Sequence, residues 1–512
     1  MVNQTLEKKS SILALILLFA LPSACVAQHS RHRHSKRHAA PVAVTVPALL
    51  LSDIHFDPYA DPGKVVRLNA APASAWAGIL AEPDSPEISA SAATLKAACP
   101  VRGTDTSAAL WRSSLAALHT NAAQVRFATL SGDLLAHSFD CKYKTLLPQA
   151  TPADYLSFTA KTVEYVLTSL HQALPGVGIY TALGNNDSGC SDYALNASND
   201  GFLTLTAKVA AQVLPSDLSQ ADRDAFLHDF AALGDFNLPL SGVPNARLIA
   251  LDDVFLSRSY KTCSGTPEAG PSVAQLDWLK QQLASAREQH QTVWFMGHIP
   301  PGVNLYATAR NFTNVCTGAP AQMFLGSEQL ADILSANADV VRLAIFGHTH
   351  ADEMRFLPSQ SAPIVVPPAN SKVPSTASGV PLKIVASISP VNGNRPTFTL
   401  AKINPTTARL QDYTVYMASN LTGVDTTWSR EYTYSTTYHQ HSFDPTALNA
   451  LVTNFQQDSG AKSPESQAYL RNYFPGDISS IIQIAWPEYA CSLNHDSSAA
   501  FAACACAAAV PK

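Results

Sequence analysis

Residues 343–350 read Leu-Ala-Ile-Phe-Gly-His-Thr-His, an apolar run that ends in a glycine and is followed at once by two histidines. Short runs of apolar or β-branched residues that end in glycine are typical of buried strands. Four further runs, at 48–53, 126–132, 179–184 and 292–297, also lead into polar blocks. The five blocks are Asp53-Ile-His55, Gly132-Asp133, Gly184-Asn185-Asn186-Asp187, Gly297-His298-Ile299-Pro300 and Gly347-His348-Thr349-His350.

Helical patterns lie between several of these strands, at 108–123, 153–171, 273–289 and 327–336. Strands that alternate with helices indicate βαβ units, and ligands bind such open sheets outside the carboxyl ends of the strands. The sequence therefore predicts an α/β fold in which the polar blocks lie at that end of the sheet.

The chain of 512 residues is long enough for one large domain, predicted at 46–402, and a smaller C-terminal subdomain at 403–512. Helical patterns at 444–457 and 463–473 favour helices in the second part. A segment rich in Pro, Ser and Ala at 366–380 predicts a loop, which is followed by a predicted strand at 384–389.

The polar blocks consist of residue types that bind divalent metal ions when a rigid scaffold brings several of them to one point. Each block taken alone has a simpler explanation, because Asp-x-His and Gly-Asn-Asn-Asp also occur as plain turns and Gly-His-Ile-Pro-Pro-Gly as a rigid loop. Five such blocks in succession, each at the end of a predicted strand, favour a metal centre.

The ordered blocks resemble those of the calcineurin-like metallophosphoesterases. Three longer stretches are similar to acid sphingomyelinase and its phosphodiesterase relatives: 53–59 (Asp-Ile-His-Phe-Asp-Pro-Tyr), 297–302 (Gly-His-Ile-Pro-Pro-Gly) and 387–398. The resemblance covers residues 49–412. It implies two mixed β-sheets flanked by helices in four layers, with the catalytic domain at 46–402 and a small C-terminal helical subdomain.

The resemblance also implies two divalent metal ions and seven ligands. One ion would take Asp53, His55 and His350, the other would take Asn185, His298 and His348, and Asp133 would bridge them. Zinc is favoured by the family, while the donor types also admit iron or manganese. A water shared by two such ions is acidified to hydroxide, which would attack phosphorus in line with the leaving oxygen. Contacts to the phosphoryl oxygens would come from Asn185, Asn186 and His298.

Asn186 departs from the family pattern, because many members have histidine at this position. An amide can donate a hydrogen bond to a phosphate oxygen but cannot deliver a proton. His137 lies four residues after Asp133, a spacing that the sphingomyelinase-like enzymes share, and is therefore predicted to be the general acid. The Gly-Asn-Asn-Asp form also resembles endopolyphosphatases.

Three other pairs of residues lie outside the predicted ligand set. Asp252 and Asp253 follow the apolar run 247–251 and could reach the site, but a solvated pair at the end of a strand is the expectation. Asp352 and Glu353 either orient the ligand imidazoles or are surface charges. Asn304 and Tyr306 are expected to pack in their loop rather than to contact substrate.

The N-terminal residues have the pattern of a secretory signal at 1–27, with two lysines, an apolar stretch at 12–21 and small residues before a cleavage point after Ala27. A lipoprotein anchored at Cys25 is the alternative, which Pro22 disfavours. A His/Arg-rich linker at 28–45 follows and is expected to be a solvated arm. These features predict a secreted or periplasmic protein without a transmembrane segment.

Eight cysteines follow the predicted cleavage point. An even number in an exported chain favours disulfides. The layout of the resembled family suggests Cys263 with Cys316, and Cys491 with Cys504 or Cys506. No Cys-x-x-Cys pair is present to indicate a zinc ribbon.

The charge balance, 34 basic against 39 acidic residues, gives no indication of nucleic-acid binding. Only about 20 residues separate the predicted cleavage point from the first strand, by the usual signal-peptide pattern. Acid sphingomyelinase has a lipid-presenting domain there, so we expect a soluble phosphodiester or pyrophosphate-type substrate, such as a nucleotide or a lipid head group. The alternative substrates are sphingomyelin and polyphosphate. The alternative functions are those of a catalytically impaired, metal-stabilised binding protein and of a metal-sequestering protein that uses the histidines of the linker.

Overall fold

The computed structural model describes residues 44–197, 201–360, 377–476 and 480–508. The predicted signal segment and lipoprotein cysteine, nearly all of the His/Arg-rich linker and most of the predicted loop at 366–380 lie outside these residues. The described residues all belong to one compact unit, Val44–Lys512.

The first sheet has six strands in the order β12-β11-β10-β1-β2-β3. Its parallel half consists of β1 (Val46–Leu51), β2 (Phe127–Ser131) and β3 (Gly178–Ala182). Its antiparallel half consists of β10 (Thr397–Ile403), β11 (Leu410–Ala418) and β12 (Trp428–Thr433). The sheet is therefore mixed, and β10 pairs directly with β1.

The second sheet also has six strands, in the order β4-β5-β6-β7-β9-β8. Its strands are β4 (Phe236–Pro239), β5 (Ala246–Ala250), β6 (Thr292–Met296), β7 (Val341–Phe346), β8 (Glu353–Pro358) and β9 (Gly379–Ile384). Strands β5, β6, β7 and β9 run parallel, whereas β4 and β8 are antiparallel to their neighbours.

Alternate side chains of β6 lie in two different hydrophobic cores, one on each face of the strand. Trp294 and Met296 belong to the core that also contains Leu50 and Phe127 of the first sheet. Val293 and Phe295 point to the other face and pack with leucines of α9 (Gly270–Glu288) and α11 (Gln329–Ala336). Successive side chains of a strand alternate between faces, so one face of this sheet packs on the first sheet and the other on helices. The predicted α/β fold of two mixed sheets with helices is confirmed.

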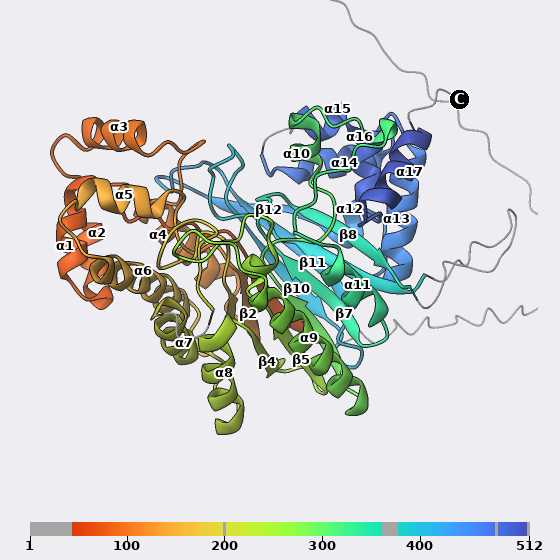
Figure 1. Cartoon of the computed structure of the whole chain (residues 1–512), viewed down its shortest axis with the longest axis horizontal. Coiled ribbons are helices and arrows are strands. Elements are labelled where there is room, and N and C mark those ends of the chain that lie inside the picture. Colours follow the sequence, from red (N-terminus) through yellow and green to blue (C-terminus); the bar gives the residue numbers. More distant parts are fainter. Residues whose placement is uncertain (1–43, 198–200, 361–376, 477–479, 509–512) are drawn as a thin grey trace, which may run out of the picture. The chain divides into compact units, whose positions relative to one another are not determined.

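Some helices alternate with the strands along the chain, and others come after the last strand (Figure 1). Those before β9 are α1 (Val65–Ala70), α2 (Trp76–Ala81), α3 (Ile88–Ala98), α4 (Ala108–Asn121), α5 (Phe139–Leu146), α6 (Pro152–Ala173), α7 (Gly201–Val213), α8 (Gln220–Leu233), α9, α10 (Leu305–Arg310) and α11. Those after β12 are α12 (Tyr434–Thr437), α13 (Pro445–Gln457), α14 (Pro464–Tyr473), α15 (Ser480–Ile484), α16 (Trp486–Ser492) and α17 (Ser498–Ala508). Capping explains several of the starts: Thr151 and Asp154 form a capping box on α6, and Ser463 caps α14.

The C-terminal helical region that the sequence predicted is present, and α13 and α14 match the patterns at 444–457 and 463–473. The division between residues 402 and 403 stays a prediction. Strands β11 and β12 lie after it and extend the first sheet.

The predicted strand at 384–389 is wrong, because β9 ends at Ile384, where the prediction begins. Beyond β9 the chain leaves the second sheet and its amides bond to the end of β1 instead. Ser389 N donates to the carbonyl of Asp53 at 3.0 Å, and Ile388 N donates to that of Ser52 at 3.3 Å. The segment after Ile384 is therefore a loop that crosses to the other sheet.

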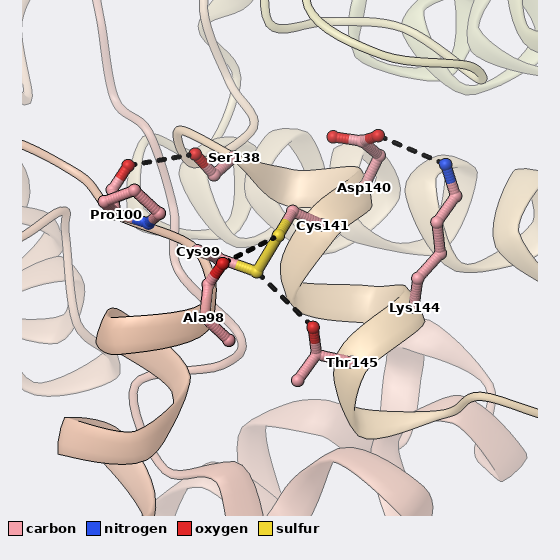
Figure 2. Close-up of a disulfide and its surroundings, with 8 residues drawn as sticks. All are labelled: Ala98, Cys99, Pro100, Ser138, Asp140, Cys141, Lys144 and Thr145. Atoms are coloured by element: carbon pink, nitrogen blue, oxygen red, sulfur yellow. Dashed lines mark hydrogen bonds and ion pairs between the residues drawn. A yellow bond between two sulfur atoms is a disulfide. The ribbon is translucent and has the colours of Figure 1, made fainter.

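Four disulfides connect all eight cysteines of the described chain: Cys99–Cys141, Cys190–Cys263, Cys316–Cys506 and Cys491–Cys504. The pairing of Cys491 with Cys504 is confirmed, and that of Cys263 with Cys316 is wrong. Cys263 lies beside Cys190 because Lys261 pairs with the segment after Cys190: Lys261 N donates to the carbonyl of Tyr193, and its carbonyl accepts from Leu195 N. Figure 2 shows the bond between Cys99 and Cys141, which links the end of α3 to α5.

Asp352 and Glu353 are buried, and neither predicted role is right. Asp352 forms an ion pair with Lys383 and accepts a hydrogen bond from the Tyr432 hydroxyl at 2.7 Å. Glu353 pairs with Arg355 and accepts from the hydroxyl of Tyr489 on α16. Both carboxylates therefore attach later segments of the chain to the second sheet.

Within the residues that the structure describes, no helix is both long and apolar enough to cross a bilayer.

We expect Asp235→Asn to stabilise the protein at neutral pH. Burial raises the pKa of Asp235 well above its usual range, and the nearby Asp252 raises it further. The folded state then binds more protons than the unfolded state, so the wild type loses stability as pH rises above the ordinary aspartate range, by up to about 1.4 kcal/mol per pH unit for one proton. An asparagine oxygen could still accept from Asp252 N and Gln275 Nε2.

Melting temperatures of wild type and Asp235→Asn at several pH values between 5 and 8 test this expectation. The advantage of the variant should grow with pH. Asp277→Asn is the control, because the Asp277 side chain is 59% exposed. An advantage that is constant with pH would contradict the assigned cause.

Candidate metal centre

The five polar blocks follow the carboxyl ends of β1, β2, β3, β6 and β7, as the sequence predicted. The two sheets meet at this point, since Asp53 N donates to the carbonyl of Gly132 within one sheet and Gly347 N to that of His298 within the other. The side chain of Asp53 then joins the sheets by accepting from His348 N at 3.0 Å. All seven predicted ligands are brought together.

The backbone at these blocks is unusual. Asp53, His55, Asp133, His348 and His350 all have positive φ angles, of 48, 44, 55, 70 and 61°. This left-handed region is uncommon for residues other than glycine and persists where the surrounding structure enforces it, which is frequent at functional sites. The conformation turns each side chain into the same space.

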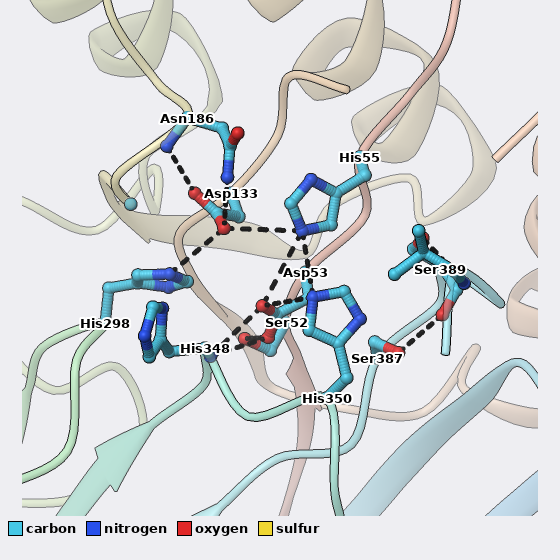
Figure 3. Close-up of polar contacts among 12 residues, drawn as sticks. Ser52, Asp53, His55, Asp133, Asn186, His298, His348, His350, Ser387 and Ser389 are labelled. Carbon is cyan, nitrogen blue, oxygen red and sulfur yellow. Dashed lines mark hydrogen bonds and ion pairs between the residues drawn. The ribbon is translucent and has the colours of Figure 1, made fainter. Parts of the chain in front are cut away.

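The first set of donor atoms consists of His55 Nε2 and three atoms that lie close to it. This nitrogen lies 3.2 Å from His350 Nε2, 3.3 Å from Asp133 Oδ2 and 3.8 Å from Asp53 Oδ1. His350 Nε2 lies 3.4 Å from Asp53 Oδ1. Four donor atoms from β1, β2 and β7 ends thus face one another (Figure 3).

The second set shares Oδ2 of Asp133 with the first. His298 Nε2 lies 3.1 Å from this oxygen and 3.2 Å from Asn185 Oδ1. His348 Nδ1 lies 2.9 Å from the same Asn185 oxygen. These four donor atoms form a second group around a second point.

Hydrogen bonds orient two of the imidazoles, those of His55 and His298, so that a nitrogen lone pair faces these points. His55 Nδ1 donates to the carbonyl of Leu135 at 2.9 Å, and His298 Nδ1 donates to that of Ser131 at 2.8 Å. Once Nδ1 carries the proton, Nε2 of a neutral ring is a free donor for a metal ion.

The separations fit two divalent ions. Ligands at about 2.0–2.2 Å from a five-coordinate ion, at angles of about 90–120° to one another, would stand about 2.8–3.8 Å apart, and four protein donors would then leave one position for water. The neighbouring donor atoms in the two sets stand 2.9–3.8 Å apart. The combination of imidazole nitrogens with carboxylate and amide oxygens suits zinc, iron or manganese.

The pKa values of the buried residues in the cluster also favour bound cations. Burial opposes ionisation of Asp53, but His350 and His55 outweigh it and lower its pKa to about 2. Burial lowers the pKa of His348 to about 4 and that of His350 to about 3. Burial also disfavours the charged form of His298, yet Asp133 outweighs it and raises the pKa to about 10. The buried carboxylates thus attract positive charge, which metal ions could supply.

Asn186 lies beside the shared carboxylate. Its backbone N–H donates to Asp133 Oδ1 at 2.8 Å, and its side-chain Nδ2 donates to Asp133 Oδ2 at 2.9 Å. The amide therefore holds Asp133, and its contact with a phosphoryl oxygen stays a prediction.

His137 lies over His55, with ring centroids 4.0 Å apart and an angle of 18° between the rings. Its side chain is 32% exposed, whereas that of His55 is fully buried. His137 is thus next to the first donor set and open to solvent on one side.

Asp253 is a supporting residue whose role the sequence did not reveal. It is fully buried and accepts hydrogen bonds from the backbone amides of His298 and Ile299 at 3.0 Å, so the expected solvated pair is wrong. Burial raises its pKa to about 7. Its position after a strand was the only indication in the sequence.

Further groups lie around His348 and at the neighbouring loop. Asn185 Nδ2 donates to Asp192 at 2.7 Å, and the rings of Tyr193 and Phe324 meet His348 edge to face at 6.5 and 6.0 Å. Asn304 caps α10. Tyr306 is 45% exposed, with the guanidinium of Arg102 5.8 Å from its ring centre.

Comparison with known proteins identifies a family and distant relatives. The model of the family "Calcineurin-like phosphoesterase" matches residues 46–352. Sphingomyelinase phosphodiesterase D of Dictyostelium discoideum is 26% identical over 294 residues, which are 56% of this chain and 58% of that protein. Cyclic GMP-AMP phosphodiesterase SMPDL3A of Homo sapiens is 25% identical over 293 residues, again 56% of this chain and 58% of the relative. Human sphingomyelin phosphodiesterase is 25% identical over 304 residues, or 57% of this chain and 42% of that protein. The chain thus spans about half the length of the curated relatives it matches.

We expect metal content to follow the two donor sets. Reconstituted wild type should hold two divalent ions per chain. His350→Gln and His298→Gln each remove a ligand of one set and should hold one ion, whereas Asp133→Asn weakens both sets and should hold less than one. Elemental analysis after gel filtration measures these values.

His119→Gln is the matched control, because His119 is exposed on α4 and bonds only to the carbonyl of Ala173. It should keep both ions. Two ions retained by Asp133→Asn would refute a carboxylate shared by both.

Proposed function

Because this chain belongs to the calcineurin-like phosphoesterase family, we propose that it is a metal-dependent phosphodiesterase that hydrolyses phosphodiester or pyrophosphate-type bonds. The observation that carries the proposal is the pair of four-atom donor sets that share Asp133 Oδ2. Two divalent ions held there would supply an activated water and neutralise charge on the phosphoryl oxygens. The seven ligands assigned from the sequence are the residues proposed to hold them.

The protein residues hold and orient the reacting groups. Asn185 lies at the second donor set, where the second hydrogen of its Nδ2 could be donated to a phosphoryl oxygen. His298 has both ring nitrogens occupied, Nδ1 by the carbonyl of Ser131 and Nε2 by the donor set, so its proposed role toward the phosphoryl group would be exerted through a bound ion. Asn186 fixes Asp133 through two hydrogen bonds, so the shared carboxylate stays in one orientation. Rigid placement of this kind supplies much of the rate enhancement in phosphoryl transfer.

His137 is the proposed proton donor to the leaving oxygen. Among the histidines of the cluster it combines contact with His55 and access to solvent. A leaving group must depart toward solvent, so a donor at this edge can reach it. Asn186 cannot take this role, since an amide does not release a proton.

A soluble phosphodiester is the proposed substrate class, such as a nucleotide or a head-group ester. The partly buried rings of Tyr193 and Phe324 beside His348 support it, because aromatic faces stack on bases. The names of the relatives mention cyclic GMP-AMP and sphingomyelin. The first is a soluble diester and the second a lipid, so the two remain to be compared by assay.

An oxidising compartment is the proposed location. The structure contains four disulfides, and disulfides persist mainly in exported proteins. The signal segment at 1–27 belongs to the same proposal.

We expect the wild type to hydrolyse bis(p-nitrophenyl) phosphate and, more slowly, diphenyl phosphate. Asp133→Asn should fall to background on both, because it loses metal. His137→Gln should keep its metal and lose about 10²–10⁴-fold in kcat on diphenyl phosphate, the usual contribution of general acid catalysis. Its loss on the p-nitrophenyl ester should be small, since p-nitrophenolate departs without a proton.

Wild-type protein that holds two ions and cleaves neither ester, p-nitrophenyl phosphate nor polyphosphate would refute the enzymatic proposal and favour a binding role. A drop in metal content in His137→Gln would instead make His137 a ligand. The control is again His119→Gln.

A further inference from the structure

Asp105 is a buried carboxylate next to His137. Its side chain is 0% exposed, and both of its oxygens are occupied. Oδ1 accepts from His137 Nδ1 at 2.9 Å and from Ser389 Oγ at 3.1 Å. Oδ2 accepts from the backbone N–H of His137 at 2.9 Å and lies 3.7 Å from Lys142 Nζ. No pattern in the sequence pointed to this residue, because Asp105 follows no predicted strand.

These contacts determine which nitrogen of His137 carries the proton. An ionised carboxylate only accepts hydrogen bonds, so Nδ1 of His137 must donate. Burial opposes ionisation of Asp105, but His137, His55 and Lys142 outweigh it and keep its pKa well below the usual range. With Nδ1 directed at Asp105, the Nε2 edge of the ring is left for the reaction space.

We propose that Asp105 is a positioning residue that holds His137 with Nδ1–H turned away from the metal-ligand cluster and Nε2–H turned toward the leaving oxygen. The inference rests on the proposed function, because it concerns how the proton donor of that reaction is oriented. A buried acceptor behind a histidine fixes both the ring orientation and the tautomer.

The surrounding structure keeps Asp105 and His137 in register. The disulfide Cys99–Cys141 joins the segment that leads to Asp105 to the helix that follows His137, and Ser138 Oγ donates to the carbonyl of Pro100 beside it (Figure 2). Lys142 on the same helix is buried and bonds to Asp57 at 2.9 Å, so its charge cannot swing away from Asp105. A third segment contributes Ser389. Asp105 is thus held from three directions.

Asparagine at position 105 has nearly the same shape as aspartate, but it would place a donor where Asp105 presents an acceptor to His137 Nδ1. The donors His137 N and Lys142 Nζ require the amide oxygen at the Oδ2 position, which leaves the NH₂ group facing His137 Nδ1. Two donors cannot face each other, so Nδ1 must lose its proton. The ring would then be a neutral Nε2–H tautomer, which is a far weaker acid than the doubly protonated ring.

The test compares wild type, Asp105→Asn, His137→Gln and the double variant on bis(p-nitrophenyl) phosphate and diphenyl phosphate, with metal content measured for each. Asp105→Asn should lose about a hundredfold in kcat on diphenyl phosphate, the lower end of the range for general acid catalysis. KM, metal content and the rate on the p-nitrophenyl ester should stay close to wild type. In the His137→Gln background the second change should add nothing, as expected for two residues that act as a unit.

A second measurement needs no turnover. Nitrogen-15 NMR of histidine-labelled protein, with His137 assigned by its loss in His137→Gln, should show a proton on Nδ1 in wild type and on Nε2 alone in Asp105→Asn. Asp61→Asn is the control, because Asp61 is a similarly enclosed carboxylate that accepts from Gly63 and Ser85 amides and pairs with Lys64. It should leave the His137 signals unchanged.

Equal losses on both esters, multiplied losses in the double variant, or a wild-type Nδ1 without a proton would each overturn the proposal. If wild type cleaves no phosphoester, the proposed function fails. The NMR result then decides by itself whether Asp105 orients His137. If Asp105→Asn fails to fold, the wild-type spectrum and Asp105→Glu, which keeps an acceptor and should keep the Nδ1 proton, provide the decision.

Discussion

The position of one carboxylate oxygen, Oδ2 of Asp133, governs the centre of this protein. It lies within 3.3 Å of His55 Nε2, 3.1 Å of His298 Nε2 and 2.9 Å of Asn186 Nδ2. These residues come from both sheets, so neither sheet alone could provide all the contacts of this oxygen. A fully desolvated carboxylate is unfavourable unless positive charge and donors surround it. The need to satisfy Asp133 therefore ties the ends of β1, β2, β3 and β6 to one another.

The strand ends were predictable, because a short stretch of sequence is enough to indicate each of them. An apolar run closed by glycine predicts a strand, and the polar residues after it must lie at the carboxyl end of the sheet. This reasoning placed the five polar blocks together, whereas the choice of seven ligands among their residues came from the family resemblance. It failed for the strand predicted at 384–389, because the segment after Ile384 is a loop in which Ser389 bonds across to Asp53. Periodicity shows that a segment is extended, but not which sheet or loop it joins.

The groups that support the ligands were much less predictable. Asp253 was expected in solvent and is instead buried against the amides of His298 and Ile299. The pairing of Cys263 with Cys316 was taken from a family layout, and the true partner Cys190 depends on contacts near Lys261. Asp105 follows no strand. In each case the partner is remote in the chain, and a carboxylate or a thiol has no sequence pattern that reveals which donor it will meet.

This contrast corresponds to a division of tasks in the structure. Metal ligands require convergence of several atoms within a few tenths of an ångström, which strand ends in a packed sheet provide. The proposed proton donor lies on a loop, where access to substrate and solvent is easier but rigidity is lower. Three constraints compensate: the disulfide before Asp105, the buried pair of Lys142 and Asp57, and the hydrogen bond of Ser389. Because the disulfide forms under oxidising conditions, one of these three constraints depends on the compartment that is proposed for the protein.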